Sequence, residues 1–217
     1  MHDRQTDRQT DRQTDRQTDR QTDRAALDWT GNDNLITVGN NRKEHTGHDY
    51  YATEPRAAEL LLLEEAFSPL IWECACGEGH LSKVFEGAGY EVISTDLIYR
   101  GYGDPEPLNF LKETLDDFEG DIVTNPPYKY AIEFVRRALE SVKPGRKVAM
   151  FLKLTFLESQ ARKAFFQQYP PKVVYVSASR LCCALNGDFK KAVRGVAYAW
   201  FVWEKGFHGD PVIRWIN

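Results

Sequence analysis

The stretch Leu-Ile-Trp-Glu-Cys-Ala-Cys-Gly-Glu-Gly, residues 70–79, contains the clearest structural pattern in the chain. Residues 70–74 form a short apolar run that is typical of a buried strand, and they lead directly into a turn with two glycines. Residues 81–88 follow a helical pattern that stops at Gly89. A strand, a glycine turn and a helix in this order predict an α/β fold built on parallel strands.

The same alternation continues on both sides of this stretch. A helix is predicted to start at Pro55, and further helices are expected at about 132–142 and at 159–169. Strands are expected at 91–95, 121–124, 147–154, 173–176, 196–203 and 212–215. We therefore predict a doubly wound, mostly parallel sheet whose last two strands form an antiparallel hairpin at one edge.

Three unusual segments follow predicted strands. They are the turn at Gly77, the acidic residue Asp96 and the loop that begins at Asn125. Because ligands of such sheets bind outside the carboxyl ends of the strands, we expect these segments to build one site.

The glycine turn and Asp96 favour a nucleoside-containing ligand. Gly77 and Gly79 allow close approach to the main chain, and a carboxylate about 19 residues later can accept hydrogen bonds from ribose hydroxyls. Taken singly, each also fits a structural turn or a helix cap. Leu81 and Ser82 stand where a dinucleotide fingerprint would have its third glycine, which argues against a nicotinamide cofactor.

The tetrapeptide Asn125-Pro126-Pro127-Tyr128 is the most specific motif. Its prolines stiffen the loop and remove two N–H donors, so that the backbone presents carbonyl acceptors. Asn125 adds an amide oxygen, and Tyr128 adds a flat face for stacking. This set of groups is suited to accept hydrogen bonds from a planar –NH₂ group; a rigid turn before a helix is the structural alternative.

Together these segments resemble class I S-adenosylmethionine-dependent methyltransferases of the Asn-Pro-Pro-Tyr type, in particular bacterial and phage DNA adenine-N6 methyltransferases, some of which serve restriction-modification. The resemblance covers most of residues 50–203 and implies S-adenosylmethionine as the cofactor. It implies that the catalytic residues are Asn125, Pro126, Pro127 and Tyr128.

The resemblance also implies a set of cofactor-binding residues. Several of them depart from common family patterns: Cys74 replaces a proline, Glu54 separates a Thr and Pro that are often adjacent, and Asn109 replaces an aspartate. The implied set is Tyr51, Thr53, Glu73, Cys74, Cys76, Gly77, Gly79, Asp96, Leu97, Asn109 and Phe110.

Charge is distributed unevenly along the chain, which has a net charge of −4. Residues 25–128 contain 6 Lys and Arg against 20 Asp and Glu, whereas residues 129–217 contain 16 against 6. The basic half favours a polyanionic substrate, and we expect adenine in DNA, flipped out of the duplex, with limited sequence specificity. The alternatives are an RNA base, a protein glutamine, or a silent cofactor- or DNA-binding module. The expected nucleic-acid contacts are Lys129, Arg180, Lys190, Lys191 and Arg194.

The chain begins with an Asp-Arg-Gln-Thr repeat that occupies residues 1–24. It contains no apolar residue after the first two positions, so we expect disorder, and we interpret it as the product of a slippage-prone tetranucleotide tract that switches expression. A zwitterionic tail with a contact role is the alternative. We expect a polar segment at 25–48 and a methyltransferase domain at 49–217.

The remaining composition points to a monomeric cytoplasmic protein without a metal. The longest apolar run has eight residues, far fewer than the roughly 20 that cross a bilayer. The four cysteines lack the spacing of a zinc site, and we expect them to be reduced thiols.

Overall fold

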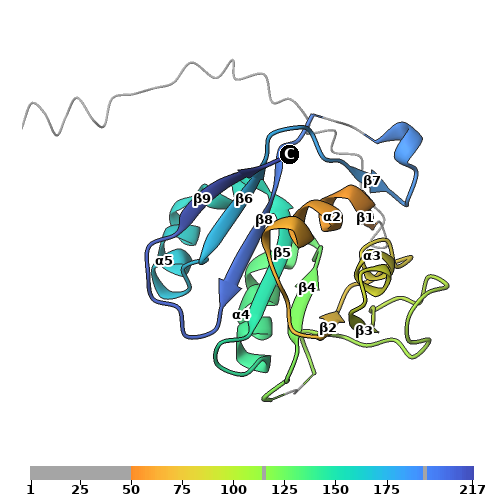
Figure 1. Ribbon diagram of the computed structural model, residues 1–217, viewed down its shortest axis with the longest axis horizontal. Helices are drawn as coiled ribbons and strands as arrows, with labels where there is room; N and C mark the ends of the chain where they lie inside the picture. The colour runs from red at the N-terminus through yellow and green to blue at the C-terminus, as the bar shows by residue number, and fades with distance from the viewer. Residues whose placement is uncertain (1–49, 114–115, 193–194) are drawn as a thin grey trace, which may run out of the picture. The chain divides into compact units, whose positions relative to one another are not determined.

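The computed structural model describes residues 50–113, 116–192 and 195–217 (Figure 1). The predicted repeat at 1–24, the predicted polar segment at 25–48 and the predicted contact Arg194 lie outside the described residues, as does the side chain of Lys191.

Seven strands form one sheet in the order β3-β2-β4-β5-β8-β6-β9 (Figure 1). Every strand runs in the same direction except β8, which pairs antiparallel with both β5 and β6. The predicted mostly parallel α/β sheet is therefore confirmed. The strands are β2 (Leu70–Glu73), β3 (Glu91–Ser94), β4 (Asp121–Thr124), β5 (Lys147–Lys153), β6 (Val173–Ser177), β8 (Tyr198–Glu204) and β9 (Val212–Ile216).

The predicted edge hairpin is wrong. β8 lies inside the sheet between β5 and β6, and β9 pairs in parallel with β6 instead of with β8. Burial explains the difference, because six of the seven residues of β8 are buried whereas four of the five in β9 are exposed. The burial of β8 is that of a strand with neighbours on both sides, whereas β9 lies at the exposed edge although four of its five residues are apolar.

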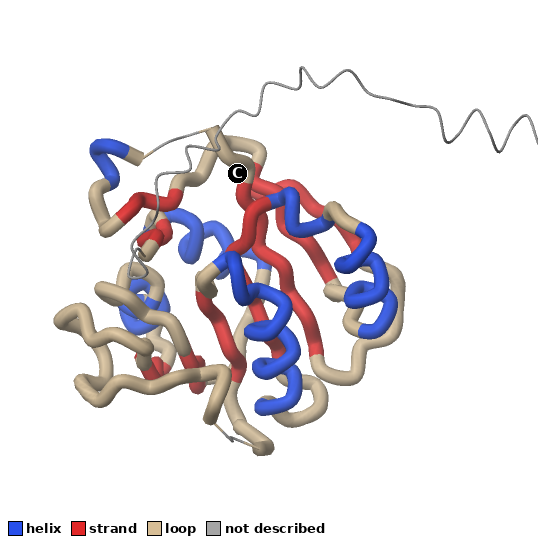
Figure 2. Tube along the Cα trace, turned by 180° about the vertical axis from the view of Figure 1, so that it is seen from behind, coloured by secondary structure: helices blue, strands red, loops and turns tan. Residues whose placement is uncertain are grey.

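Helices cover both faces of the sheet. The core on one face includes residues of α2 (Pro55–Glu64) and α3 (Ser82–Gly87), and the core on the other includes α4 (Ala131–Ser141) and α5 (Gln160–Gln168). Figure 2, seen from behind, shows the second pair in front of the strands. α4 buries residues spaced three and four apart, which is why it packs as an amphipathic helix. None of the described helices combines the length and apolar character needed to cross a membrane.

A separate two-stranded ribbon joins distant parts of the chain. β1 (Tyr51–Thr53) pairs antiparallel with β7 (Cys183–Leu185), so that Thr53 lies opposite Cys183. β7 lies between the strands predicted at 173–176 and 196–203, where the sequence pattern indicated no strand. Three short 3₁₀ helices complete the described elements: η1 (Tyr128–Tyr130), η2 (Leu154–Leu157) and η3 (Phe189–Lys191).

Candidate functional site

The glycine turn and the Asn125 loop begin side by side. β2 and β4 are neighbouring parallel strands, with Ile71 paired to Asp121 and Trp72 to Ile122. Each loop leaves the carboxyl end of its strand, where ligands of parallel sheets bind. The structure therefore brings both motifs to one edge of the sheet.

Asp96 joins the end of β3 to the glycine turn. The main-chain N–H of Gly77 donates to Oδ2 of Asp96 at 2.8 Å, and the N–H of Ile98 donates to Oδ1 at 3.0 Å. A carboxylate offers about four lone-pair positions, so each oxygen of Asp96 can still accept from another donor. This geometry permits Asp96 to hold the turn and to receive two hydroxyl groups at the same time.

Aromatic rings lie over both glycines of the turn. Gly77 and Gly79 have φ of +56° and +76°, which L side chains rarely adopt. A Cβ atom on Gly77 would lie 3.0 Å from the ring of Tyr50, and one on Gly79 would lie 2.2 Å from the ring of Tyr102. The glycines are thus required by the backbone and by two tyrosines as well as by any ligand.

Glu73, at the end of β2, is a buried acid in a chain of hydroxyl groups. Ser94 Oγ donates to Ser82 Oγ at 2.8 Å, and Ser82 donates in turn to Glu73 Oε2. The side chain is only 2% exposed, and this burial raises the pKa of Glu73 to about 8. Through Ser82 and Ser94, Glu73 therefore links the end of β2 to the start of α3 and to β3, and it is mainly neutral at pH 7.

The other predicted cofactor residues differ in accessibility. Leu97 is exposed, whereas Cys74 and Cys76 are buried and burial raises the pKa of both thiols, that of Cys76 to about 12. Asn109 is half-buried and its Oδ1 accepts from the N–H of Leu111. Phe110 is 2% exposed and packs on Trp72 with ring centroids 5.1 Å apart, so its side chain belongs to the core.

The amide of Asn125 has a defined orientation. Its Nδ2 donates to the main-chain carbonyl oxygen of Tyr51 at 2.8 Å. Because a carbonyl oxygen only accepts, the amide nitrogen must face Tyr51 and Oδ1 must point elsewhere. That Oδ1 atom is buried and has no hydrogen-bond partner. Asn125 therefore presents a free acceptor, the group that a ligand –NH₂ requires.

Tyr128 is held at its hydroxyl and along its ring. The hydroxyl lies 3.2 Å from Sγ of Cys183, and burial raises the pKa of Tyr128 well above its usual value. The ring lies 6.3 Å from that of Tyr51 and 6.0 Å from that of Tyr198, centroid to centroid. Nζ of Lys153, the last residue of β5, lies 5.1 Å from the centroid of the Tyr128 ring.

Unsatisfied polar atoms gather at this edge. Among the described residues, the buried side-chain atoms without a partner include Oγ1 of Thr53, Oγ1 of Thr124 and Oδ1 of Asn125. Thr124 precedes Asn125 in the chain, and Thr53 lies two residues after Tyr51. The hydroxyls of Thr53 and Thr124 lie beside the thiols of Cys183 and Cys74. Buried polar atoms in native structures almost always have partners, so Oδ1 of Asn125 is the atom of the three that indicates a polar ligand.

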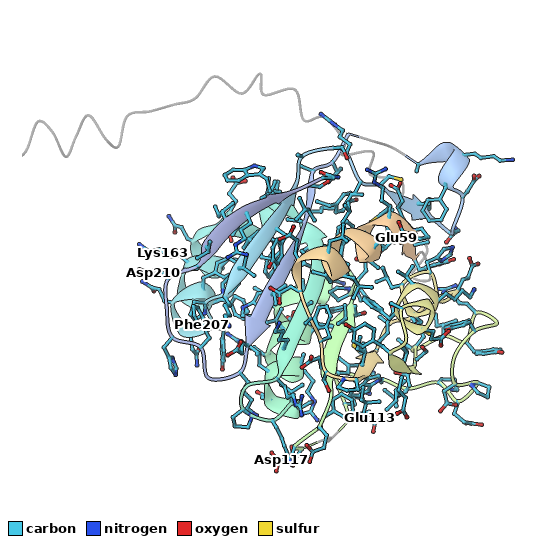
Figure 3. All side chains as sticks on the ribbon, in the orientation of Figure 1. Glu59, Glu113, Asp117, Lys163, Phe207 and Asp210 are labelled. Atoms are coloured by element: carbon cyan, nitrogen blue, oxygen red, sulfur yellow. The ribbon has the colours of Figure 1, made fainter. Side chains whose placement is uncertain are left out.

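The predicted nucleic-acid contacts that the structure describes lie on exposed surface. Lys129 follows Tyr128 directly in η1, Lys190 lies in η3, and Arg180 lies in the loop after β6. The ring of Phe189 in η3 packs against the ring of His80, beside the glycine turn, with ring centroids 5.3 Å apart. The acidic Asp117, labelled at the bottom of Figure 3, lies just before β4, at the amino end of that strand.

Sequence patterns missed Lys153 and Cys183 as residues of this site. Lys153 is the second-to-last residue of the strand predicted at 147–154, so its place near the carboxyl edge was a usable signal. Cys183 gave no such signal, because its contact with Tyr128 depends on the β1–β7 ribbon. Among residues 50–113, 116–192 and 195–217, no three His, Cys, Asp or Glu side chains are grouped so as to hold a metal ion.

No family model and no curated protein sequence matches the chain. Solved structures do resemble it. A protein from Lactococcus lactis that is provisionally called a hemolysin has a TM-score of 0.54 at 12% identity, over 74% of this chain and 91% of that chain. A structure of a type I R-M system has a TM-score of 0.50 at 14% identity, over 75% of this chain but only 44% of that chain.

A TehB-like SAM-dependent methyltransferase from Corynebacterium glutamicum has a TM-score of 0.47 at 12% identity, over 69% of this chain and 86% of that chain. At sequence identities of 12–14%, the similarity to these structures shows only that the fold is alike. The strand order, together with the two structures that have TM-scores of 0.50 and above, shows a Rossmann-like, mostly parallel α/β fold.

Proposed function

We propose that this protein transfers a methyl group from S-adenosylmethionine to the exocyclic amine of adenine in DNA. The observation that carries the proposal is the buried, unpartnered Oδ1 of Asn125, which lies at the same edge of the sheet as the Gly77 turn. The domain that performs this reaction is assigned to residues 49–217.

The residues around the Gly77 turn fit the cofactor. Asp96 retains lone pairs for two ribose hydroxyls, and the exposed Leu97 next to it offers an apolar surface to a purine. The hydroxyl of Thr53, beside the thiol of Cys183, can donate to the cofactor's carboxylate. The bound cofactor supplies a methyl group already activated on a sulfonium.

The Asn125 loop fits the acceptor. Oδ1 of Asn125 and the carbonyl oxygen of Pro126 each accept one N–H of the amine, while the ring of Tyr128 stacks on the base. Drawing both N–H groups to one side favours a pyramidal nitrogen whose lone pair points away from the acceptors. These acceptors also stabilise the positive charge that develops on the nitrogen during transfer.

Positive charge near the Asn125 loop favours a nucleic-acid substrate. Lys129 adjoins Tyr128 in the chain, and Lys153 lies over its ring. We propose that both lysines contact the phosphates that flank a flipped-out base. An RNA base or a protein glutamine side chain would also satisfy the two acceptors. RNA would fit the basic surface as well as DNA does, whereas a glutamine side chain would give the lysines no phosphate to contact.

The proposal is tested by incubating the full chain with methyl-labelled S-adenosylmethionine and, in separate reactions, unmethylated DNA, RNA and a protein extract. Digestion to nucleosides and mass spectrometry then locate the label. We expect label at N6 of adenine in DNA and its loss in Asn125→Ala. Label in protein alone would contradict the substrate, label unaffected by Asn125→Ala would contradict the site, and no transfer to any acceptor would favour a silent binding module.

A further inference from the structure

The β1–β7 ribbon contacts both polar side chains of the Asn-Pro-Pro-Tyr loop. On β1, the carbonyl oxygen of Tyr51 accepts from Asn125. On β7, Sγ of Cys183 lies 3.2 Å from the Tyr128 hydroxyl and 3.9 Å from Nδ2 of Asn125. A single sulfur atom therefore lies within contact distance of the two side chains proposed to hold the acceptor.

Cys183 has the properties of a neutral hydrogen-bonding group. Its residue is 5% exposed, and burial raises the pKa of the thiol. A protonated thiol can donate one hydrogen bond and accept others, although each bond is weaker than one made by oxygen. The site as described uses no sulfur nucleophile, so this buried thiol has no other role in the proposed transfer.

The ribbon that carries Cys183 is fixed at both ends. The N–H of Asn186 donates to the carbonyl oxygen of Tyr50 at 2.9 Å. The N–H of Glu54 donates to the carbonyl oxygen of Cys182 at 3.2 Å. Oε2 of Glu54 also accepts from the N–H of Cys182 at 3.2 Å. Because Glu54 immediately precedes α2, these bonds tie the position of Cys183 to the folded core.

We propose that Cys183 is a positioning residue for methyl transfer, which acts by holding the hydroxyl of Tyr128. This inference rests on the proposed function. Tyr128 has only two side-chain torsions. Anchoring its hydroxyl fixes χ1, and so the position of the ring relative to Oδ1 of Asn125, while the neighbouring rings of Tyr51 and Tyr198 restrain rotation of the ring plane about χ2. A base stacked on that ring then keeps its amine at the acceptor, and reactions between positioned groups depend strongly on such alignment.

The test compares Cys183→Ala with Cys182→Ala in the full chain, using the DNA substrate that the wild type methylates best. Cys182 is equally buried at 5%, and its Sγ faces Oε2 of Glu54 at 3.3 Å instead of Tyr128. The two variants remove the same group from adjacent positions, so a loss of packing alone affects both. Cys183→Ser keeps a hydrogen-bonding group and serves as the conservative variant.

Cys183→Ala is expected to lower kcat about fivefold, as the loss of one net hydrogen bond would, with KM for S-adenosylmethionine unchanged. Cys182→Ala should retain kcat, and Cys183→Ser should recover most of it. In the Tyr128→Phe background, which lacks the hydroxyl, Cys183→Ala should cause no further loss.

Equal kcat in Cys183→Ala and Cys182→Ala would overturn the inference. So would an about fivefold fall in kcat when Cys183→Ala is added to the Tyr128→Phe variant. Failure of the proposed function is recognised separately, because then the wild type itself transfers no methyl group to any acceptor. Thermal unfolding of each variant, monitored by circular dichroism, shows whether the variant is folded at the assay temperature. If the kcat loss of Cys183→Ala arises from unfolding and disappears when the assay is run at a lower temperature, the inference is also overturned.

Discussion

Nδ2 of Asn125 lies 2.8 Å from the carbonyl oxygen of Tyr51, a residue 74 positions earlier in the chain. This contact decides which end of the amide is free. With the nitrogen engaged, the acceptor oxygen is left without a partner, and it is buried. The function proposed for the site depends on this one orientation.

The first prediction concerns Asn125→Asp. A carboxylate has no donor, so one of its oxygens would face the carbonyl oxygen of Tyr51, and two acceptors would repel each other. We expect kcat to fall by about 10²-fold, as when one acceptor or donor of a transition-state site is removed, and to a level near that of Asn125→Ala. Steady-state transfer assays with each variant measure this. Wild-type kcat in Asn125→Asp would contradict the assigned orientation.

The second prediction concerns Asp96. Asp96→Ala removes the acceptor of the Gly77 N–H and the proposed ribose contact together, so calorimetric titration should show S-adenosylmethionine binding weakened at least tenfold, or about 1.4 kcal/mol. Asp104→Ala is the matched control, because this exposed residue likewise accepts from a main-chain N–H two positions later, that of Glu106. Equal affinity in the two variants would remove Asp96 from the cofactor site.

The third prediction separates backbone strain from crowding in the glycine turn. Gly79→Ala and Gly89→Ala both place a side chain at positive φ, +76° and +93°. Only the first also meets a neighbour, the ring of Tyr102, whereas nothing lies within 4 Å of a Cβ on Gly89. We expect Gly79→Ala to lower the free energy of unfolding by about 1–3 kcal/mol more than Gly89→Ala does, as overpacking typically costs. Urea denaturation measures this, and equal losses would show that Tyr102 moves away freely.

The fourth prediction is a dependence of stability on pH. The pKa of Glu73 is raised from 4.5 to about 8, so between these values the folded state binds more protons at this group than the unfolded state does. The contribution of Glu73 to stability is therefore complete below pH 4.5, falls as pH rises, and reaches its lowest level above about pH 8.

Glu73→Gln removes the titrating group and keeps an acceptor for Ser82. The free energy of unfolding of Glu73→Gln relative to wild type should rise steadily between pH 5 and 8, by up to about 1.4 kcal/mol for each pH unit. Urea denaturation at pH 5, 6, 7 and 8 checks this. A difference that stays constant with pH would show that Glu73 is ionised throughout.

The fifth prediction concerns DNA binding. Lys129→Gln and Lys190→Gln should each reduce the slope of log affinity against log salt by about one, because each lysine is proposed to contact a phosphate. Lys163→Gln is the control, since Lys163 is an exposed lysine on α5 that we place outside the contact surface. Fluorescence anisotropy with labelled duplex DNA gives the slopes. The same slope in all three variants would exclude Lys129 and Lys190 from the interface.

Local signals made much of the fold predictable. The strand 121–124 was predicted at its observed bounds because its residues 122–124 are apolar or β-branched and a Pro-Pro loop follows. Gly77, Asp96 and Asn125 were expected to meet because each follows a strand of a parallel sheet. That inference needs only the strand order and no knowledge of side-chain contacts.

Contacts between distant segments were not predictable. β7 has three residues, each paired with a residue 130 to 134 positions earlier, so no periodicity marks it. The interior position of β8 depends on its pairing with β5 and β6, and the sequence pattern of a single strand does not specify its partners. The core position of Phe110 and the contact of Cys183 with Tyr128 arise in the same way, from packing.

The most direct test of the account is a crystal structure of the protein with S-adenosylmethionine bound. An acceptor nitrogen should lie about 2.9 Å from Oδ1 of Asn125 and about 3–3.5 Å from the methyl carbon before transfer. The account therefore predicts the adenosine beside Asp96 and a methyl carbon about 4–6 Å from Oδ1 of Asn125, pointing toward it. A methyl group directed away from Asn125, or a cofactor bound at another edge of the sheet, would contradict it.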